Sequence, residues 1–257
     1  MIAFWPDVIR PILEVLQPAN IVEIGSESGK TTRLLLEFAQ NHDARVHAID
    51  PAPAFDAESW QREIPESFSF TRLPSLVGLP AIEQFDVVLI DGDHNWYTVY
   101  NELQLIERLS GQIGQPLPLV FLHDIGWPYG RRDLYYNPST IPQEYRRPYA
   151  RKGISPTSSR LLSAGGLNAK LCNAMEEGGE KNGVLTAIED YLEHTQAQIE
   201  LVKIPAVFGL GILLPAALAE ANPAVAKKVH AWATPEIERF IDRLEMARIA
   251  MLTGVTG

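Results

Sequence analysis

Residues 21–32 read IVEIGSESGKTT, a short apolar run that ends in a glycine turn and leads straight into a helical pattern. Glu23 lies near the end of the apolar run, and Gly25 and Gly29 allow the backbone of the turn to approach a ligand closely. The helix that follows offers unpaired N–H groups at its positive end. The stretch therefore predicts a strand, a turn and a helix that bind a ligand, and the nature of that ligand decides the function.

The composition limits the classes of protein to which the chain can belong. Its 257 residues, 46% of them hydrophobic, can form one large domain or two small ones around a substantial core. The formal net charge of -10 disfavours nucleic acid and anionic membranes as partners, so a small molecule is the default ligand. The single cysteine, Cys172, and an N-terminus without the pattern of a signal peptide lead us to expect a cytoplasmic protein.

Apolar runs and helical patterns alternate along the first half of the chain. The connections are long enough for crossovers, so we expect an α/β fold with a mainly parallel sheet and helices on both faces. The predicted strands are residues 21–24, 45–49, 68–73, 85–91 and 117–122, and the predicted helices are residues 5–16, 30–39, 60–64 and 96–109.

The pattern changes in the last third of the chain. Residues 197–204 and 207–214 have the pattern of two strands, and almost nothing separates them in the sequence. This predicts an antiparallel hairpin whose second strand is buried. A helix at residues 184–194 precedes the hairpin, and a helix with Pro215 in its first turn follows it. A last helix begins with Thr234 as N-cap. Its apolar residues suit packing or a homodimer contact, namely Ile237, Ile241, Leu244 and Met251.

A long insertion follows the fifth predicted strand. Residues 125–183 are rich in Pro, Gly, Tyr and Arg, and loops of this length are usually functional or disordered. Arginine forks bind oxyanions and aromatic faces stack on rings, so we expect a lid that binds substrate. A folded cover with solvated charges, or a surface for single-stranded RNA, would use the same residue types. Residues 1–257 then form one predicted domain, with an N-terminal helix in 1–18 and C-terminal helices in 215–257.

Glycine spacing separates three interpretations of the turn. The dinucleotide pattern Gly-x-Gly-x-x-Gly is absent, because three residues separate Gly25 from Gly29. A phosphate-binding P-loop, Gly-x-x-x-x-Gly-Lys-Ser/Thr, is missed by one residue, and residues 86–91 resemble the strand and carboxylate that hold magnesium in such proteins. A shorter loop can scarcely wrap a phosphate, and Glu23 and Glu27 would set negative charge beside it. A cationic ligand that carries a hydroxylated sugar fits better.

The turn, Asp50 after the second predicted strand and the terminal hairpin together resemble a class I S-adenosylmethionine-dependent methyltransferase. The resemblance covers roughly residues 20–124 and 184–214 and implies a Rossmann-like, seven-stranded sheet with S-adenosylmethionine as cofactor. It implies that Asp50 binds the ribose and that residues 73–75 lie near adenine. The methionine part would lie against Glu23, Gly25, Ser26 and Gly29.

Polar residues follow the fourth and fifth predicted strands, at the edge where an open parallel sheet binds its ligand. Asp-Gly-Asp-His at residues 91–94 and the pair His123-Asp124 resemble a bacterial group of methyltransferases that includes enzymes acting on sugars and natural products. The resemblance implies that Asp91 lies at the cofactor and that Asp91 and Asp124 hold a divalent metal such as Mg²⁺. The further acidic or amide ligand that is usual in metal-binding relatives is missing.

Attack of a hydroxyl on a sulfonium methyl group requires that the hydroxyl lose its proton or have its pKa lowered. We expect His94 to act as general base, oriented by Asp124 or Asp91, with His123 as a further catalytic residue. Alternatively, His94 caps the next helix or contacts cofactor, and His123 is a hydrogen-bonded buried residue. The resemblance, together with these residues, thus implies O-methylation of a small polar acceptor such as a sugar or specialised metabolite. A P-loop-like nucleotide-binding protein and a non-catalytic member of the methyltransferase fold are the alternatives.

Overall fold

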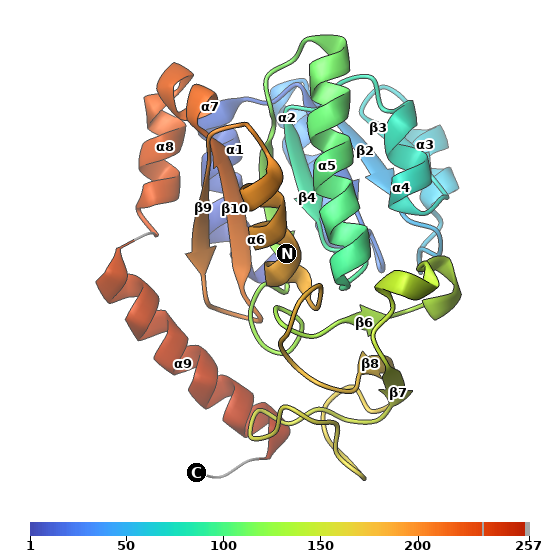
Figure 1. Ribbon diagram of the computed structural model, residues 1–257. Helices are drawn as coiled ribbons and strands as arrows, with labels where there is room; N and C mark the ends of the chain where they lie inside the picture. Colours follow the sequence, from blue (N-terminus) through green and yellow to red (C-terminus); the bar gives the residue numbers. More distant parts are fainter. Residues whose placement is uncertain (233, 255–257) are drawn as a thin grey trace.

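The computed structural model describes residues 1–232 and 234–254, and its centre is a seven-stranded sheet (Figure 1). The strands are β1 (Asn20–Ile24), β2 (Arg45–Ile49), β3 (Phe68–Thr71), β4 (Val87–Ile90), β5 (Leu119–His123), β9 (Ile199–Ile204) and β10 (Leu210–Pro215). Their order is β3-β2-β1-β4-β5-β10-β9, and β10 runs antiparallel to both β5 and β9. The α/β fold and its terminal antiparallel hairpin are therefore confirmed.

Helices cover both faces of the sheet, because successive side chains of a strand point to opposite faces. In β4, Val87 and Leu89 join one core while Val88 and Ile90 join the other. The first core is covered by η1 (Ile2–Phe4), η2 (Trp5–Ile9), α1 (Arg10–Leu16), α2 (Lys30–His42), α3 (Ala57–Glu63), α7 (Ala216–Ala221) and α8 (Pro223–His230). The second is covered by α4 (Ser75–Gly78), η3 (Leu79–Ala81), α5 (Trp96–Ile113) and α6 (Val184–His194).

The C-terminal helix α9 (Pro235–Thr253) begins as predicted, with the Thr234 side chain accepting a hydrogen bond from Ile237 N, and it extends along one side of the molecule (Figure 1). Across residues 1–232 and 234–254 we find no helix with the length and apolar character needed to cross a membrane. Residues 233 and 255–257 of the expected C-terminal helical segment lie outside the described residues.

Several predicted boundaries were wrong. The second strand of the hairpin begins at Leu210 rather than at residue 207, because Val207 and Phe208 adopt left-handed backbone angles. Pro215 ends this strand and precedes α7 instead of standing in its first turn. The strand β5 includes His123, which pairs with Leu210. The helix α8 lies within the predicted C-terminal helical segment 215–257 but was not predicted as a separate helix.

The insertion folds into a small layer of its own below the main sheet (Figure 1). A three-stranded antiparallel sheet of order β6-β8-β7 forms from β6 (Leu134–Tyr135), β7 (Tyr149–Arg151) and β8 (Cys172–Ala174), with two short helices, η4 (Pro138–Thr140) and η5 (Gln143–Tyr145). These strands have two or three residues each, too few for an alternating pattern to reveal them in the sequence.

Candidate active site

The glycine turn after β1 packs directly on the end of β4. Gly25 has a φ of 85°, and its N–H donates to Ile49 O at 2.9 Å. A Cβ at this position would lie 2.5 Å from Gly92 Cα and 2.6 Å from the carbonyl carbon of Asp91. Gly29, with a φ of 72°, is the residue before α2. Both glycines are therefore required by backbone conformation, and Gly25 also by close approach.

Asp50, directly after β2, holds the glycine turn. Its Oδ2 accepts hydrogen bonds from Ser26 N at 2.9 Å and Glu27 N at 2.8 Å, and its Oδ1 accepts one from Ala52 N at 2.7 Å. The two turn amides thus bind a carboxylate of the chain itself, whereas in a P-loop such amides bind phosphate. A carboxylate has about four lone-pair sites, so Asp50 keeps little capacity for a further donor such as a ribose hydroxyl.

Glu23 lies inside the sheet, and only 2% of its surface is exposed. Thr32 Oγ1 donates to its Oε2 at 2.6 Å, while Oε1 has no hydrogen-bond partner among the described residues. Burial raises the pKa of Glu23 to about 8, so the carboxyl is mostly neutral at pH 7. The prediction of a negative charge at Glu23 is therefore wrong. Of the two carboxylates expected to repel a phosphate, only Glu27 remains.

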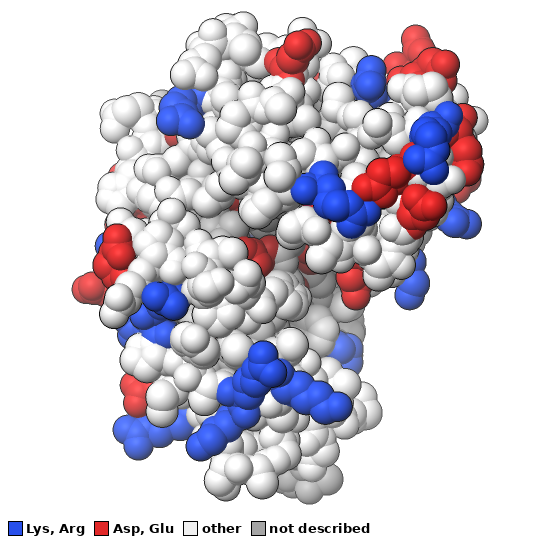
Figure 2. All heavy atoms as spheres, turned by 90° about the vertical axis from the view of Figure 1, so that its right-hand side faces the viewer, with Lys and Arg blue, Asp and Glu red and all other residues white. Residues whose placement is uncertain are grey.

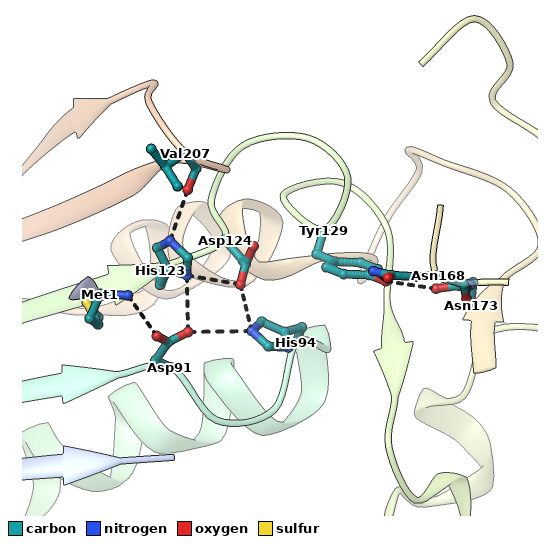
Figure 3. Close-up of polar contacts among 9 residues, drawn as sticks. All are labelled: Met1, Asp91, His94, His123, Asp124, Tyr129, Asn168, Asn173 and Val207. Atoms are coloured by element: carbon teal, nitrogen blue, oxygen red, sulfur yellow. Dashed lines mark hydrogen bonds and ion pairs between the residues drawn. The ribbon is translucent and has the colours of Figure 1, made fainter. Parts of the chain in front are cut away.

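The structure brings together the four polar residues expected at the ends of β4 and β5 (Figure 3). His94 Nε2 lies 2.8 Å from Asp124 Oδ2 and 3.7 Å from Asp91 Oδ1. His123 Nδ1 lies 3.1 Å from each of the same two oxygens. The amine of Met1 is 3.0 Å from Asp91 Oδ2. Two carboxylates are thus surrounded by two imidazoles and an amine.

Proton positions in this cluster follow from its geometry. His123 Nε2 contacts Val207 O at 3.0 Å, and a carbonyl can only accept, so this nitrogen carries hydrogen. Burial alone would lower the pKa of His123, but Asp124 and Asp91 raise it to about 9. Burial would likewise lower the pKa of His94, but Asp124 and Asp91 raise it well above its usual value. The two imidazoles in turn hold the pKa of both carboxyls below the usual range, against the effect of burial.

His94 does not cap the following helix. Asn95 is the N-cap residue of α5, and its side chain accepts from Thr98 N at 2.9 Å. The N–H directions of His94 miss Asp124, so their short contact is an ion pair without hydrogen-bond alignment, and Nδ1 has no partner among the described residues. The rings of Tyr129 and Tyr136 each lie 5.7 Å from the His94 ring, centroid to centroid. The insertion therefore covers this histidine.

Asp133 joins the insertion to the loop that carries His94, a connection that the sequence did not reveal. Its Oδ1 accepts from Trp96 N and from Gly183 N, both at 2.7 Å, and its Oδ2 accepts from Tyr135 Oη at 2.7 Å. Leu134 N also donates to His94 O at 2.8 Å. This part of the insertion is fixed to the site by hydrogen bonds.

Asp91, His123 and Asp124 could also hold a metal ion. Each offers one ligand atom, and the three atoms lie within 4.8 Å of one another. Two carboxylate oxygens suit a hard cation such as Mg²⁺, whereas an imidazole nitrogen suits Mn²⁺, Fe²⁺ or Zn²⁺ better. The residues fit a divalent cation in number and type, and His123 is a ligand that the sequence prediction did not include.

Glu102 on α5 is a second buried acid near the site. It is fully buried, Ser75 Oγ donates to its Oε1, and its Oε2 has no partner in residues 1–232 and 234–254. Burial raises its pKa from 4.5 to about 8. Between these values the Glu102 carboxyl is protonated in the folded chain and ionised in the unfolded chain, so it makes stability fall as pH rises through this window.

We expect Glu102→Gln to remove the contribution of Glu102 to this pH dependence, because an amide fills the same space without titrating, while the contribution of Glu23 remains. For each pH unit between 4.5 and 8, the free energy of unfolding of the native chain should fall by up to about 1.4 kcal/mol more than that of the variant. Urea denaturation at several pH values measures the slope. Glu107→Gln, on the same helix and only partly buried, is the control. Equal slopes for Glu102→Gln and the native chain would contradict the assignment.

The insertion differs in charge from the rest of the chain. Residues 125–183 contain nine Lys and Arg against five Asp and Glu, which is a net charge of +4. Because the whole chain has a net charge of -10, the remaining residues have a net charge of -14. Figure 2 shows a group of Lys and Arg side chains on the lower part of the molecule, where Figure 1 places the small sheet. The exposed basic residues of the insertion are Arg151, Lys152, Arg160, Lys170 and Lys181.

The chain is similar to solved methyltransferase structures and to one family model. The S-adenosylhomocysteine-bound methyltransferase PaMTH1 of Podospora anserina is 14% identical, with a TM-score of 0.48 over 80% of this chain and 76% of that chain. The 1,6-didemethyltoxoflavin-N1-methyltransferase of Burkholderia thailandensis is 15% identical, with a TM-score of 0.45 over 80% and 73%. No curated protein matches the chain. Residues 22–125, which contain the glycine turn, Asp50 and the four-residue cluster, match the family model described as a methyltransferase domain.

Proposed function

We propose that this protein is an S-adenosylmethionine-dependent methyltransferase that methylates a hydroxyl group of a small polar acceptor, such as a sugar or specialised metabolite. The main support is the match of residues 22–125 to a methyltransferase domain, together with a polar cluster at the ends of β4 and β5 inside that range. In open α/β sheets, ligands bind at this carboxyl edge.

The cofactor site in this proposal consists of Glu23, Gly25, Ser26, Gly29, Asp50 and Asp91. Oε1 of Glu23, which has no partner among the described residues, is a buried polar atom that a ligand donor would satisfy. Asp50 would act chiefly by shaping the turn, since three backbone amides already bind it. Ser75, in the segment expected near adenine, begins α4.

His94 is the proposed general base, because its Nδ1 has no partner in the described part of the chain and its ring lies between the strand-end carboxylates and the tyrosines of the insertion. A base must be neutral before it accepts a proton. The proposal therefore requires that the ion pair with Asp124 be broken when cofactor and acceptor bind. His123, whose two ring nitrogens already face acceptors, would stabilise charge rather than take up a proton.

Asp91, His123 and Asp124 would hold a divalent metal if one is used. Such an ion would lower the pKa of the acceptor hydroxyl. The exposed arginines and lysines of the insertion favour an acceptor that carries a carboxylate, phosphate or sugar.

Calorimetry tests the proposed function. We expect S-adenosylhomocysteine to bind in equimolar amount and Mg²⁺ with ATP to give no binding heat. Asp50→Ala should weaken S-adenosylhomocysteine binding at least tenfold, about 1.4 kcal/mol, because the turn loses its carboxylate. Asp56→Ala, which removes the N-cap carboxylate of α3, is the control. Binding of ATP in place of S-adenosylhomocysteine would instead establish the nucleotide-binding alternative.

We further propose that α9 pairs with the same helix of a second copy. Phe240, Leu244 and Met251 are 54%, 55% and 78% exposed, and with Ala247 they form a stripe spaced by four, three and four residues. Two such stripes in antiparallel arrangement place Phe240 opposite Met251 and Leu244 opposite Ala247, which is a self-complementary contact. Ile237 and Ile241, which were predicted to share this contact, are half-buried.

Leu244→Glu should therefore raise the dimer dissociation constant at least 100-fold, roughly 3 kcal/mol, because a charge would be buried in the contact. Sedimentation velocity over a range of concentrations measures the change. Met246→Glu is the matched control, since Met246 is also exposed but lies off the stripe. A native chain that sediments as a monomer at all concentrations would refute the dimer.

A further inference from the structure

The connection between β9 and β10 contains two residues in an unfavourable backbone conformation. Val207 and Phe208 have φ angles of 46° and 69°, in the left-handed region that β-branched and aromatic residues rarely adopt. A residue in this conformation is strained and persists only where neighbouring groups hold it. The contacts of this turn should therefore explain why it is maintained.

Glu245 of α9 holds the two amides of the turn. Its Oε2 accepts from Val207 N at 3.0 Å, and its Oε1 accepts from Phe208 N at 2.8 Å. Arg248 binds the same carboxylate through two hydrogen bonds of 2.7 Å, and its guanidinium lies 4.4 Å from the Phe208 ring centroid. Glu245 is 8% exposed, although its helix lies at the edge of the molecule.

The carbonyl groups of the same turn hold the end of β5. Val207 O accepts from His123 Nε2 at 3.0 Å (Figure 3), and Phe208 O accepts from Gly126 N at 2.6 Å. Because Val207 O fixes Nε2 as a donor, the ring must present Nδ1 to Asp91 and Asp124. The turn thus connects the C-terminal helix to the orientation of one imidazole in the cluster.

We propose that Glu245 is a positioning residue for the active site: by clamping the Val207–Phe208 turn, it fixes the ring of His123 against Asp91 and Asp124. The role of Glu245 in catalysis rests on the proposed function, whereas its effect on the His123 ring does not. The C-terminal helix is then part of the site's architecture, although it lies outside the matched residues 22–125.

Proton NMR of the His123 ring tests the proposal without any acceptor. The Nε2–H bonded to Val207 O should be protected from exchange with water, so its signal should be visible in the native chain. The signal is assigned to His123 because it should be absent from the spectrum of His123→Gln. We expect Glu245→Gln to lose this signal. The side-chain amide replaces one of the two carboxylate oxygens that accept from the turn, and it breaks the ion pair with Arg248. Glu236→Gln is the matched control, since Glu236 also pairs with an arginine three residues later, Arg239 at 3.3 Å, but is exposed.

An unchanged Nε2–H signal in Glu245→Gln would overturn the proposal. If that variant does not fold, Arg248→Met leaves the carboxylate in place and removes its partner, and it should speed exchange of the His123 Nε2–H. Unchanged exchange in Arg248→Met would likewise overturn the proposal. Adding Val207→Gly to Glu245→Gln should restore the signal in part, because glycine adopts the turn without a clamp. Native-chain calorimetry with S-adenosylhomocysteine tests the proposed function separately, so the two failures are distinguishable.

Discussion

Gly25→Ala should abolish binding of S-adenosylhomocysteine and lower the free energy of unfolding by roughly 3–5 kcal/mol. The added methyl group would lie 2.5 Å from Gly92 Cα and 2.6 Å from the carbonyl carbon of Asp91, and backbone atoms cannot move aside as a flexible side chain can. Alanine is also disfavoured at a φ of 85°. Moving the turn away from β4 would separate the glycine loop from Asp91. Urea denaturation and calorimetry measure the two effects.

Gly111→Ala provides the control, because Gly111 lies in α5 and its added methyl group would meet no atom of the described residues within 4 Å apart from its chain neighbours and the nearby backbone of its own helix. We expect it to leave binding unchanged and to stabilise the chain by about 0.5–1 kcal/mol, since alanine loses less backbone entropy in a helix. If Gly25→Ala bound the cofactor product as tightly as Gly111→Ala does, the turn would not be the cofactor site.

His94→Gln should lower the rate of methyl transfer about 10²- to 10⁴-fold, the contribution typical of a general base. Glutamine fills similar space but cannot take up a proton, and Asp124 would lose its ion pair. Binding of S-adenosylhomocysteine should change little. Single-turnover measurements with an acceptor found in a panel of hydroxylated sugars and specialised metabolites separate the chemical step from binding.

The matched control for this substitution is His194→Gln, since His194 lies at the end of α6 and contacts Tyr100, away from the cluster. It should transfer methyl groups at the native rate. Full single-turnover activity in His94→Gln would remove His94 from the mechanism. A native chain that binds cofactor but methylates nothing in the panel would favour the non-catalytic alternative.

The sheet and the proximity of Asp91 to Asp124 could be predicted from the sequence because both depend on local patterns of apolar and polar residues. Apolar runs mark β4 and β5, and the carboxyl ends of neighbouring parallel strands must lie at one edge. Val207 shows where such reasoning fails. It continues an apolar run and was predicted as strand, but its amide is held by Glu245, which is 38 residues later and belongs to the helix α9. Tertiary contacts of that kind leave no periodicity in the sequence.

The protonation of the buried acids was equally hidden in the sequence. Glu23 was read as a negative charge, whereas enclosure within the sheet keeps its carboxyl neutral at pH 7. Asp133 lies in a segment whose composition indicated only an insertion, yet it accepts hydrogen bonds at the start of two helices, from Trp96, the first residue of α5, and from Gly183, the residue before α6. Both properties depend on which groups surround the side chain after folding.

The difference in charge between the insertion and the remainder also affects how fast partners arrive. The net charge of -10 repels an anion from most of the surface, but the insertion, with a net charge of +4, attracts an anion that comes close to it. At physiological ionic strength this influence reaches only about 8 Å from the surface, and added salt shortens it further. Association of an anionic acceptor should therefore slow as salt is raised, whereas association of an uncharged sugar should not.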